Sequence, residues 1–284
     1  MNELFEILLR QNAWFLGALT LFGVATVLYA TVLWRNHADR LHSAASWVFG
    51  AAALLSLGFI ASRWLEAGRP PFKSLYESLM LFTACMSILY VSVERWYRIA
   101  WLGCATSAMG VGVLGYAVSK ADAEIINLPA ALQSGWFVPH VVVYFFGYSA
   151  VFLAFVAAAL HLIKPQQVVT LRTSDGQTQQ MTFAGFMHKT ILLAFVLLTA
   201  GLIIGAIWAK TAWGDYWVWD PKENWALISW LVFAIYLHLR LTKAFSERAA
   251  AILTVIGFAT ISFTYLGMHL LPTAEQSEHV YQGN

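Results

Sequence analysis

Residues 208–230 concentrate the side chains best suited to binding a flat, largely apolar ligand. The stretch reads W-A-K-T-A-W-G-D-Y-W-V-W-D-P-K-E-N-W-A-L-I-S-W, and it contains six of the 13 tryptophans of the chain. Indole rings offer broad, rigid apolar faces with one N–H donor each, which suits planar ligands with polar edges. Gly214 and Pro221 predict that the segment is not one unbroken helix. A charged group lies among the rings: Asp215, Asp220, Lys222 and Glu223.

A membrane anchor is the plainer alternative, because tryptophan is enriched at membrane surfaces. Aromatic belts, however, spread over many helix ends, whereas here six rings share one segment with acids and a lysine. This clustering favours a ligand-binding platform. Asp220 and Glu223 are expected to shape the loop, to bond indole N–H groups or to orient a ligand histidine. The predicted platform consists of Trp208, Trp213, Trp217, Trp219, Asp220, Lys222 and Trp225.

Two histidines far apart in the sequence accompany this platform. His140 follows Pro139 at the start of one apolar stretch, and His269 ends the last apolar stretch. The spans given below place both on the same side of the membrane as the tryptophan segment. Taken singly, each is more often an interfacial histidine than a ligand. Together they match a planar metal macrocycle, because two imidazoles can bind the iron axially while aromatic faces cover the ring.

His238 differs because it lies inside an apolar stretch, W-L-V-F-A-I-Y-L-H-L-R. An ionisable group within a membrane span is costly and is a functional candidate by default. The alternative is that it reaches the inner surface or bonds a tyrosine or a backbone carbonyl. No second histidine of this chain lies clearly at its depth, although His161 and His188 stay open, and this absence points to a partner histidine in a second protein. The remaining histidines, expected to be solvated near the membrane surface or in the tail, are His37, His42, His161, His188 and His279.

The composition places the chain in a bilayer. Hydrophobic residues make up 60% and charged residues 11% of it, against about 25% charged for a soluble domain. At about 20 apolar residues per spanning helix, we predict an all-α polytopic bundle of about eight transmembrane helices. They cover roughly 13–34, 44–62, 75–94, 99–118, 140–163, 188–208, 225–243 and 249–269.

These spans leave one integral membrane domain over residues 1–284 and no soluble domain. Residues 208–225 form an external segment within it, and 164–187 form a loop, predicted to be a small hairpin with Asp-Gly at its turn. The N-terminus lacks the basic region of a cleavable signal peptide, so the first span is expected to be retained. Cys85 and Cys104 show no C-x-x-C pattern, which argues against a disulfide framework or a dithiol redox motif.

Basic residues set the expected orientation. Of the 17 Lys and Arg residues, seven fall on the side of the tryptophan segment: Arg10, Arg63, Arg69, Lys73, Lys120, Lys210 and Lys222. The other ten fall on the opposite side, which is therefore expected to be cytoplasmic and to include the 164–187 loop. Both termini and the tryptophan segment are then expected on the outer, periplasmic side.

The pattern W-G-x-Y-W-x-W-D-P-K-E-x-W resembles the tryptophan-rich WWD signature of haem-handling membrane proteins in cytochrome c maturation. Its Asp-Pro-Lys-Glu continuation is similar to the CcsA/ResC (also named CcsB) branch of the System II pathway. Gly68-Arg69-Pro70-Pro71-Phe72 with Leu75-Tyr76-Glu77-Ser78-Leu79 resembles an outer loop of that family, and the three singled-out histidines fall in the family's order.

The resemblance implies transient binding of haem b as a substrate. His140 and His269 would be the external axial ligands, and His238 would be this chain's half of a transmembrane haem site. The other half would belong to a ResB/Ccs1-type membrane subunit. Apocytochrome c would be the acceptor, thioredoxin-like thiol-reducing proteins would act indirectly, and no nucleic acid is expected. Haem propionates would need cationic or N–H partners, for which Lys222, Arg63, Arg69 and Lys73 are candidates.

The predicted function is haem delivery to the outer face and presentation to the C-x-x-C-H segment of apocytochrome c. The chain would be a component of a holocytochrome c synthase complex rather than active alone, and no catalytic residue is assigned. Its expected location is the bacterial inner membrane, or the thylakoid membrane in a plastid. The alternatives are a haem exporter or chaperone without ligation activity, and a transporter of another aromatic ligand with histidine proton relays.

Overall fold

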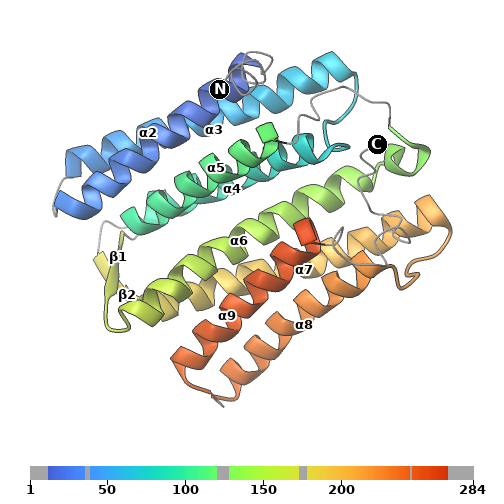
Figure 1. The fold of residues 1–284 in the computed structure, drawn as a ribbon. Coiled ribbons are helices and arrows are strands. Elements are labelled where there is room, and N and C mark those ends of the chain that lie inside the picture. The colour runs from blue at the N-terminus through green and yellow to red at the C-terminus, as the bar shows by residue number, and fades with distance from the viewer. Residues whose placement is uncertain (1–11, 36–38, 120–127, 173–177, 244, 268–284) are drawn as a thin grey trace. The chain divides into compact units, whose positions relative to one another are not determined.

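Eight long helices form nearly all of the structure (Figure 1). The computed structural model describes residues 12–35, 39–119, 128–172, 178–243 and 245–267. Eight helical stretches in these ranges are long and apolar enough to cross a membrane, the last being Glu247–Gly267, and this confirms the predicted number of spans. The helices are α2 (Ala13–Arg35), α3 (Asp39–Ala67), α4 (Leu75–Tyr97), α5 (Ala100–Ser119), α6 (Phe137–Ile163), α7 (Phe183–Trp213), α8 (Pro221–Leu241) and α9 (Glu247–Ser262).

Several helices run past the apolar stretches that predict them. The predicted span 44–62 lies within α3, and the predicted span 188–208 lies within α7, which has 31 residues. Hydropathy detects only the part of a helix that must avoid water, whereas capping side chains set where the helix begins. Thr182, for example, caps α7 by accepting a hydrogen bond from the backbone N–H of Gly185 at 3.1 Å.

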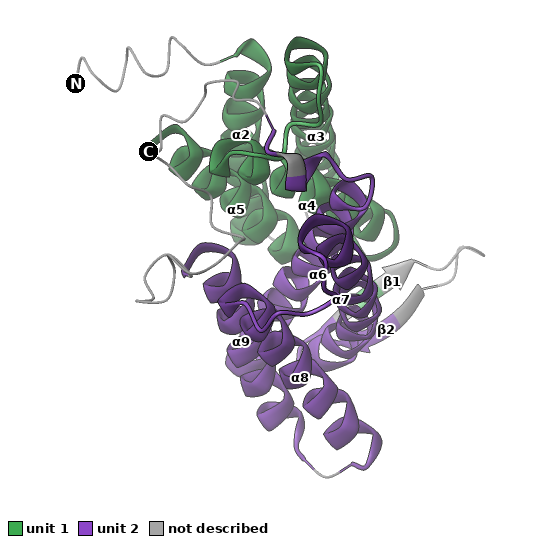
Figure 2. Cartoon of the chain, turned by 90° about the vertical axis from the view of Figure 1, so that its right-hand side faces the viewer, with its two compact units in different colours: residues 1–127, 170–179 green, residues 128–169, 180–284 purple. Residues whose placement is uncertain are grey.

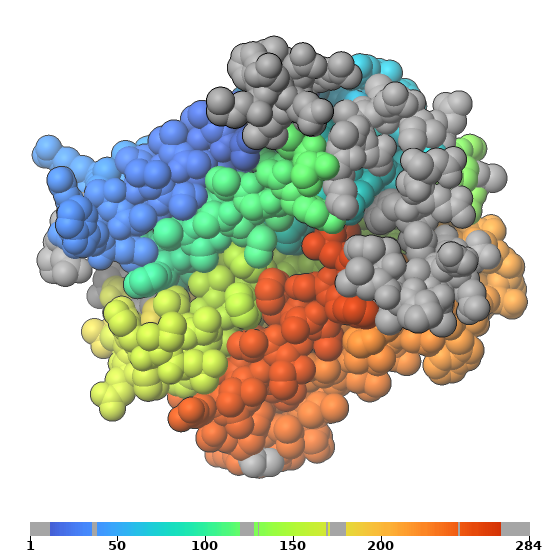
Figure 3. Space-filling model, viewed as in Figure 1, coloured from blue at the N-terminus to red at the C-terminus, as the bar shows by residue number. Residues whose placement is uncertain are grey.

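The chain divides into two compact units of four helices each (Figure 2). In the unit of residues 1–127 and 170–179, consecutive helices from α2 to α5 adjoin, and α5 closes against α2. In the unit of residues 128–169 and 180–284, α6 to α9 adjoin in the same way, and α9 closes against α6. The space-filling view shows α8 beside α9 at the surface of this second unit (Figure 3).

A short β-hairpin lies between α6 and α7, as the sequence predicts for residues 164–187. Strand β1 (Val168–Arg172) pairs with strand β2 (Thr178–Thr182) in a two-stranded sheet. The predicted Asp-Gly turn lies outside the described residues. The hairpin is all the strand structure found in the described part of the chain.

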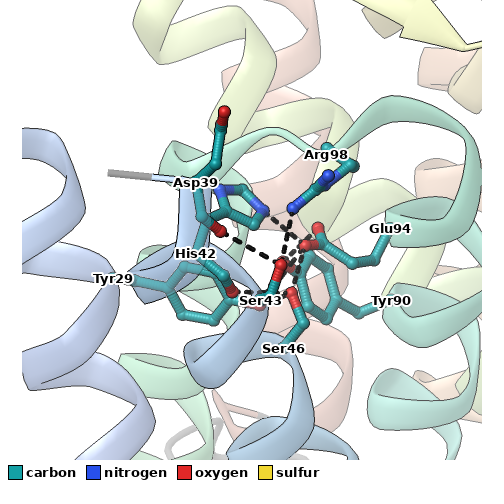
Figure 4. Close-up of polar contacts among 8 residues, drawn as sticks. All are labelled: Tyr29, Asp39, His42, Ser43, Ser46, Tyr90, Glu94 and Arg98. Carbon is teal, nitrogen blue, oxygen red and sulfur yellow. Dashed lines mark hydrogen bonds and ion pairs between the residues drawn. The ribbon is translucent and has the colours of Figure 1, made fainter. Parts of the chain in front are cut away.

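Buried carboxylates at both ends of α4 connect neighbouring segments of the first unit. At one end, Glu94 lies among residues of α2, α3 and α4 (Figure 4). His42 Nε2 lies 2.6 Å from Glu94 Oε1, the Ser46 hydroxyl donates to the same oxygen at 2.7 Å, and the Tyr90 hydroxyl donates to Oε2 at 2.6 Å. The Tyr29 hydroxyl of α2 donates to Ser46 at 3.2 Å. Each carboxylate oxygen therefore has a donor.

The other end of α4 carries Glu77, whose side chain is fully buried. Arg63 Nε lies 3.2 Å from Glu77 Oε1, and Arg69 Nη1 lies 3.1 Å from Oε2. The backbone N–H of Lys73 also donates to Oε2 at 3.0 Å. Glu77 thus connects the end of α3 to the Gly68–Phe72 loop.

The expectation that His42 and His161 are solvated is wrong. His42 is 7% exposed and His161 is 4% exposed. His42 is buried because Glu94 of α4 supplies a hydrogen-bond partner. The sequence around His42 gives no sign of this partner. His188 is partly exposed, whereas His37 and His279 lie outside the described residues.

We expect Glu94→Ala to lower the free energy of unfolding by about 3–5 kcal/mol, because it leaves buried donors and a buried imidazole without their acceptor. Unfolding by SDS titration in mixed micelles measures the loss. Glu66→Ala is the matched control, since Glu66 is exposed on α3, and it should change stability by less than about 0.5 kcal/mol. Equal losses in the two variants would show that the Glu94 network does not stabilise the unit.

Candidate functional site

The tryptophan segment joins the end of α7 to the start of α8, within the second unit. Helix α7 ends at Trp213, and Gly214 follows in the left-handed conformation with φ of 91°. Helix α8 begins at Pro221, the position where a missing N–H costs least. The structure therefore confirms that Gly214 and Pro221 interrupt the helix.

Asp220 and Glu223 shape the connecting loop through a capping box. Asp220 Oδ1 accepts from the backbone N–H of Lys222 at 2.7 Å. Glu223 Oε2 accepts from the backbone N–H groups of Val218 at 3.0 Å and Asp220 at 3.1 Å. Both carboxylates are buried at the helix start, where the helix dipole favours negative charge. The expected loop-shaping role of these acids is confirmed.

Trp219 is the outermost ring of the loop. Its side chain is 67% exposed, and its backbone has a φ of 60°, a left-handed value uncommon for a residue with a side chain. The Asn224 side-chain amide donates to the Trp219 carbonyl oxygen at 2.9 Å and holds this conformation. The Trp217 ring meets Trp219 edge to face at 6.0 Å between centroids. Trp217 Nε1 is buried without a hydrogen-bond partner among the described atoms.

Trp208 lies beneath the loop rather than on its surface. Only 3% of it is exposed, and its Nε1–H donates to the carbonyl oxygen of Ala131 at 2.9 Å. Ala131 belongs to the short 3₁₀ turn η1 (Ala130–Gln133) that precedes α6. The Trp208 ring packs against Trp213 at 4.7 Å and against His140 at 5.6 Å, the latter nearly parallel at 28°. Trp208 is therefore a buried residue that connects Trp213, His140 and the turn before α6.

His140 binds the backbone of α7 through one ring nitrogen. Its Nδ1 lies 2.9 Å from the carbonyl oxygen of Gly201. A carbonyl oxygen only accepts, so Nδ1 carries the proton, and a neutral ring keeps its lone pair on Nε2. Metal-binding histidines commonly donate their second N–H to a backbone carbonyl in this way. The Tyr144 ring also meets the imidazole edge to face, at 4.9 Å between centroids.

The end of α9 packs beside the same segment. A π-helical turn, η2 (Phe263–Gly267), follows α9, and such turns are frequent near functional sites. Trp225 meets Phe263 at 4.4 Å between ring centroids, and the Thr264 hydroxyl lies 3.3 Å from the Trp225 carbonyl oxygen. Tyr265 contacts Phe145 of α6 at 5.4 Å. His269 lies outside the described residues.

His238 lies far from this end of α8. It follows Asp220 by 18 residues in the sequence, which at 1.5 Å per helical residue corresponds to about 27 Å. Its side chain is exposed on the surface of the unit, whereas Tyr236 is fully buried. Ile228, Leu231 and Ile235 are also exposed, at helical spacing that places them on the His238 face.

The candidate cations differ in their surroundings. Arg63 and Arg69 belong to the first unit, and both bind the buried carboxylate of Glu77. Lys222 lies in the first turn of α8, within the tryptophan segment. Of these three candidates, Lys222 is therefore the one that lies within the tryptophan segment.

The sequence does not predict the backbone carbonyl groups that accept hydrogen bonds from His140 and Trp208. A carbonyl acceptor can belong to any residue, so no side-chain pattern marks Gly201 or Ala131. One signal is nevertheless present, because Gly201 and Gly205 form the small-x-x-x-small spacing that allows membrane helices to approach closely.

We expect Asp220→Ala to loosen the loop without unfolding the unit. Loss of the N-cap acceptor, at about 1 kcal/mol, should make amide exchange over residues 218–224 about fivefold faster. Hydrogen–deuterium exchange with mass spectrometry measures this. Asp220→Asn should behave as the wild type, and Ser246→Ala, which removes the N-cap of α9, should spare these amides. Unchanged exchange in Asp220→Ala would contradict the capping role.

Comparison with known proteins identifies related chains over most of the length. The family model described as Cytochrome C assembly protein matches residues 72–274. The cytochrome c biogenesis protein CcsA of Synechococcus sp. strain CC9902 is 31% identical over 277 residues, covering 88% of this chain and 91% of the relative. CcsA of Synechococcus sp. strain RCC307 is 36% identical over 248 residues, with 78% and 80% covered. CcsA of Mesostigma viride is 32% identical over 255 residues, with 79% and 84% covered.

A solved structure, Cytochrome c Heme Lyase CcmF, has a similar fold. Its TM-score is 0.61 at 17% sequence identity, and the match covers 90% of this chain. The chain spans 47% of the length of that structure. At this identity the likeness concerns the fold.

Proposed function

The chain belongs to the cytochrome c assembly protein family, and from that premise we propose that it binds haem at the tryptophan segment and presents it to apocytochrome c. The family predicted from the Asp-Pro-Lys-Glu continuation of the tryptophan pattern is confirmed by the CcsA relatives. The chain is thus a multi-pass membrane protein of cytochrome c biogenesis. The haem site and its ligands are the proposal.

His140 carries this proposal. Its Nδ1 is held by the Gly201 carbonyl oxygen at 2.9 Å, so the neutral ring offers Nε2 to a metal. Trp208 stacks on the ring and Tyr144 meets it edge to face, and both contacts restrain its orientation. A histidine solvated at a membrane surface needs no such restraint, whereas an axial ligand does.

We assign His269 as the second axial ligand. Tyr265, four residues before it, contacts Phe145, which is five residues after His140. Phe263 of the same turn packs against Trp225. The described residues before His269 therefore adjoin both α6 and the tryptophan segment. This supports pairing the two histidines across one haem.

The aromatic loop is proposed to cover the macrocycle. Trp219 is exposed, Trp217 meets its ring, and Trp213 continues the cluster to Trp208. A propionate is an anion that needs N–H donors or a cation. The unpartnered Nε1–H of Trp217 and the ammonium group of Lys222 are the proposed partners from this segment.

Attachment needs no reactive cysteine from this chain. Each thiol of the C-x-x-C-H segment adds across one haem vinyl group, so that sulfur bonds to the carbon beside the ring and the thiol hydrogen is added to the terminal carbon. Electrons balance without an oxidant, provided that thioredoxin-like proteins keep the thiols reduced. The histidine of C-x-x-C-H takes one axial position, so His140 or His269 must release the iron. Haem b is therefore a substrate, held with moderate affinity.

His238 is proposed as a ligand of a second haem site shared with a ResB/Ccs1-type subunit. Its imidazole is exposed among aliphatic side chains on the outer face of α8. An ionisable group on such a surface needs a partner. A histidine from the partner subunit would supply the second ligand, and haem would enter there from the cytoplasmic side. This proposal includes both termini on the outer side of a bacterial inner membrane or of a thylakoid membrane.

One experiment separates haem attachment from haem export alone. The chain is purified with its partner subunit, supplied with haem and a reduced C-x-x-C-H peptide, and assayed for the Soret band and for thioether products. If the complex transfers haem to the peptide but forms no thioether bonds, the chain acts in haem export without attachment. If neither the chain nor the complex shows a Soret band, the haem assignment fails and a transporter of another aromatic ligand becomes the better reading.

We expect His140→Ala and His269→Ala each to weaken the haem signal of the complex, with partial recovery on adding imidazole. Free imidazole can occupy the position of the deleted ring and bind the iron. Absorption spectra and bound-haem assays measure the effect. His161→Ala is the control, since His161 lies at the opposite end of α6 from His140. Full haem content in both variants would show that His140 and His269 are not the axial ligands.

We expect His238→Ala to lower the amount of haem that reaches the outer site in cells, because the shared site loses a ligand. Haem added to the purified complex should restore the signal, since His140 and His269 are intact. Ile235→Ala, on the same exposed face, should deliver normal amounts. Normal cellular loading of His238→Ala would contradict a role in delivery.

A further inference from the structure

Helix α7 has a side-chain-free notch where it meets α6. Gly201 and Gly205 are four residues apart and so lie on one face of the helix. A Cβ atom at Gly201 would lie 2.8 Å from Cδ2 of Tyr144. A Cβ atom at Gly205 would lie 2.5 Å from Cε1 and 2.7 Å from Nδ1 of His140. Two rings of α6 therefore occupy the space that side chains on α7 would need.

The two glycines serve His140 differently. Gly201 provides the carbonyl oxygen that accepts from Nδ1. Gly205 provides the space in which the ring lies against the α7 backbone. Alanine is the better helix former at an interior position, so a glycine at 205 runs against helix propensity. The close approach of the His140 ring gives that glycine a physical reason.

A ring packs closely on a glycine at other positions of this chain too. A Cβ atom at Gly257 would lie 2.5 Å from the Phe233 ring. Phe233 has no ring nitrogen, however, and packing alone decides its position. At Gly205 the ring is a histidine whose Nδ1 reaches a carbonyl oxygen one turn away on the same helix.

We propose that Gly205 is a positioning residue for His140, one that lets the imidazole reach the Gly201 carbonyl oxygen and so presents Nε2 to the haem iron. This inference rests on the proposed function. The hydrogen bond fixes the tautomer and strengthens the ring as an electron donor. A stronger axial donor favours ferric iron and lowers the reduction potential of the bound haem. The notch thus sets both the direction and the donor strength of the ligand.

The test compares Gly205→Ala with two glycine controls in the complex with the partner subunit. Gly257→Ala matches the steric overlap without a histidine, and Gly112→Ala adds a methyl group where nothing lies within 4 Å. We expect Gly205→Ala to weaken haem binding by about tenfold to a hundredfold and to raise the reduction potential of the haem that remains. Both controls should keep the wild-type potential and spectrum. A wild-type potential and haem content in Gly205→Ala would overturn the inference.

A double variant separates positioning from general packing. If Gly205 acts through His140, then Gly205→Ala should add no further loss of haem binding to His140→Ala when both are measured without added imidazole. The double variant should also accumulate normally, because the ring that the new methyl group meets is gone. A further loss, or poor accumulation of the double variant, would overturn the inference. Full haem binding by His140→Ala would instead refute the proposed ligand itself.

Discussion

A hydrogen bond between an imidazole and a helix backbone organises the tryptophan end of the second unit. For His140 to reach the Gly201 carbonyl oxygen, α6 and α7 must approach until no side chain separates them. Trp208 then stacks on the imidazole, and its own N–H fixes the turn that leads into α6. Glycine spacing, helix approach, ring orientation and loop position therefore depend on one another. A change in any of them is transmitted to Nε2 of His140.

The first unit solves a different problem, that of placing charges within membrane-spanning helices. Both carboxylates lie on α4: the donors to Glu77 come from the end of α3 and the loop before α4, whereas His42 and Ser46 reach Glu94 from a distant part of the sequence. Glu77 collects two guanidinium groups and a backbone N–H, and Glu94 collects a histidine, a serine and a tyrosine. Buried ion pairs of this kind contribute little net stability compared with apolar packing, yet they tolerate no loss of a partner. They therefore specify which helix ends meet.

The sequence predicts the helices well and their partners poorly. Hydropathy locates all eight spans because burial in a bilayer requires long apolar runs. Gly214, Pro221 and the acids around them predict the loop, since each acts on its immediate neighbours. His42 shows the limit, because its depth is readable from the sequence but its bond to Glu94 depends on the packing of α3 against α4. The Gly201 carbonyl acceptor of His140 is invisible for the same reason. Contacts between residues distant in the sequence depend on how the helices pack, and a single sequence does not reveal that packing.

The backbone at Trp219 is strained by the side chain that it carries. A glycine would adopt its left-handed φ of 60° freely, whereas a residue with a side chain incurs about 1 kcal/mol there. The loop keeps the costly residue and holds it with a hydrogen bond from Asn224. Substitution by glycine would relax the backbone and delete the indole ring. Trp219 therefore places an exposed indole ring on a backbone conformation that glycine would adopt without strain, so the outward face of this ring is present at a cost in stability.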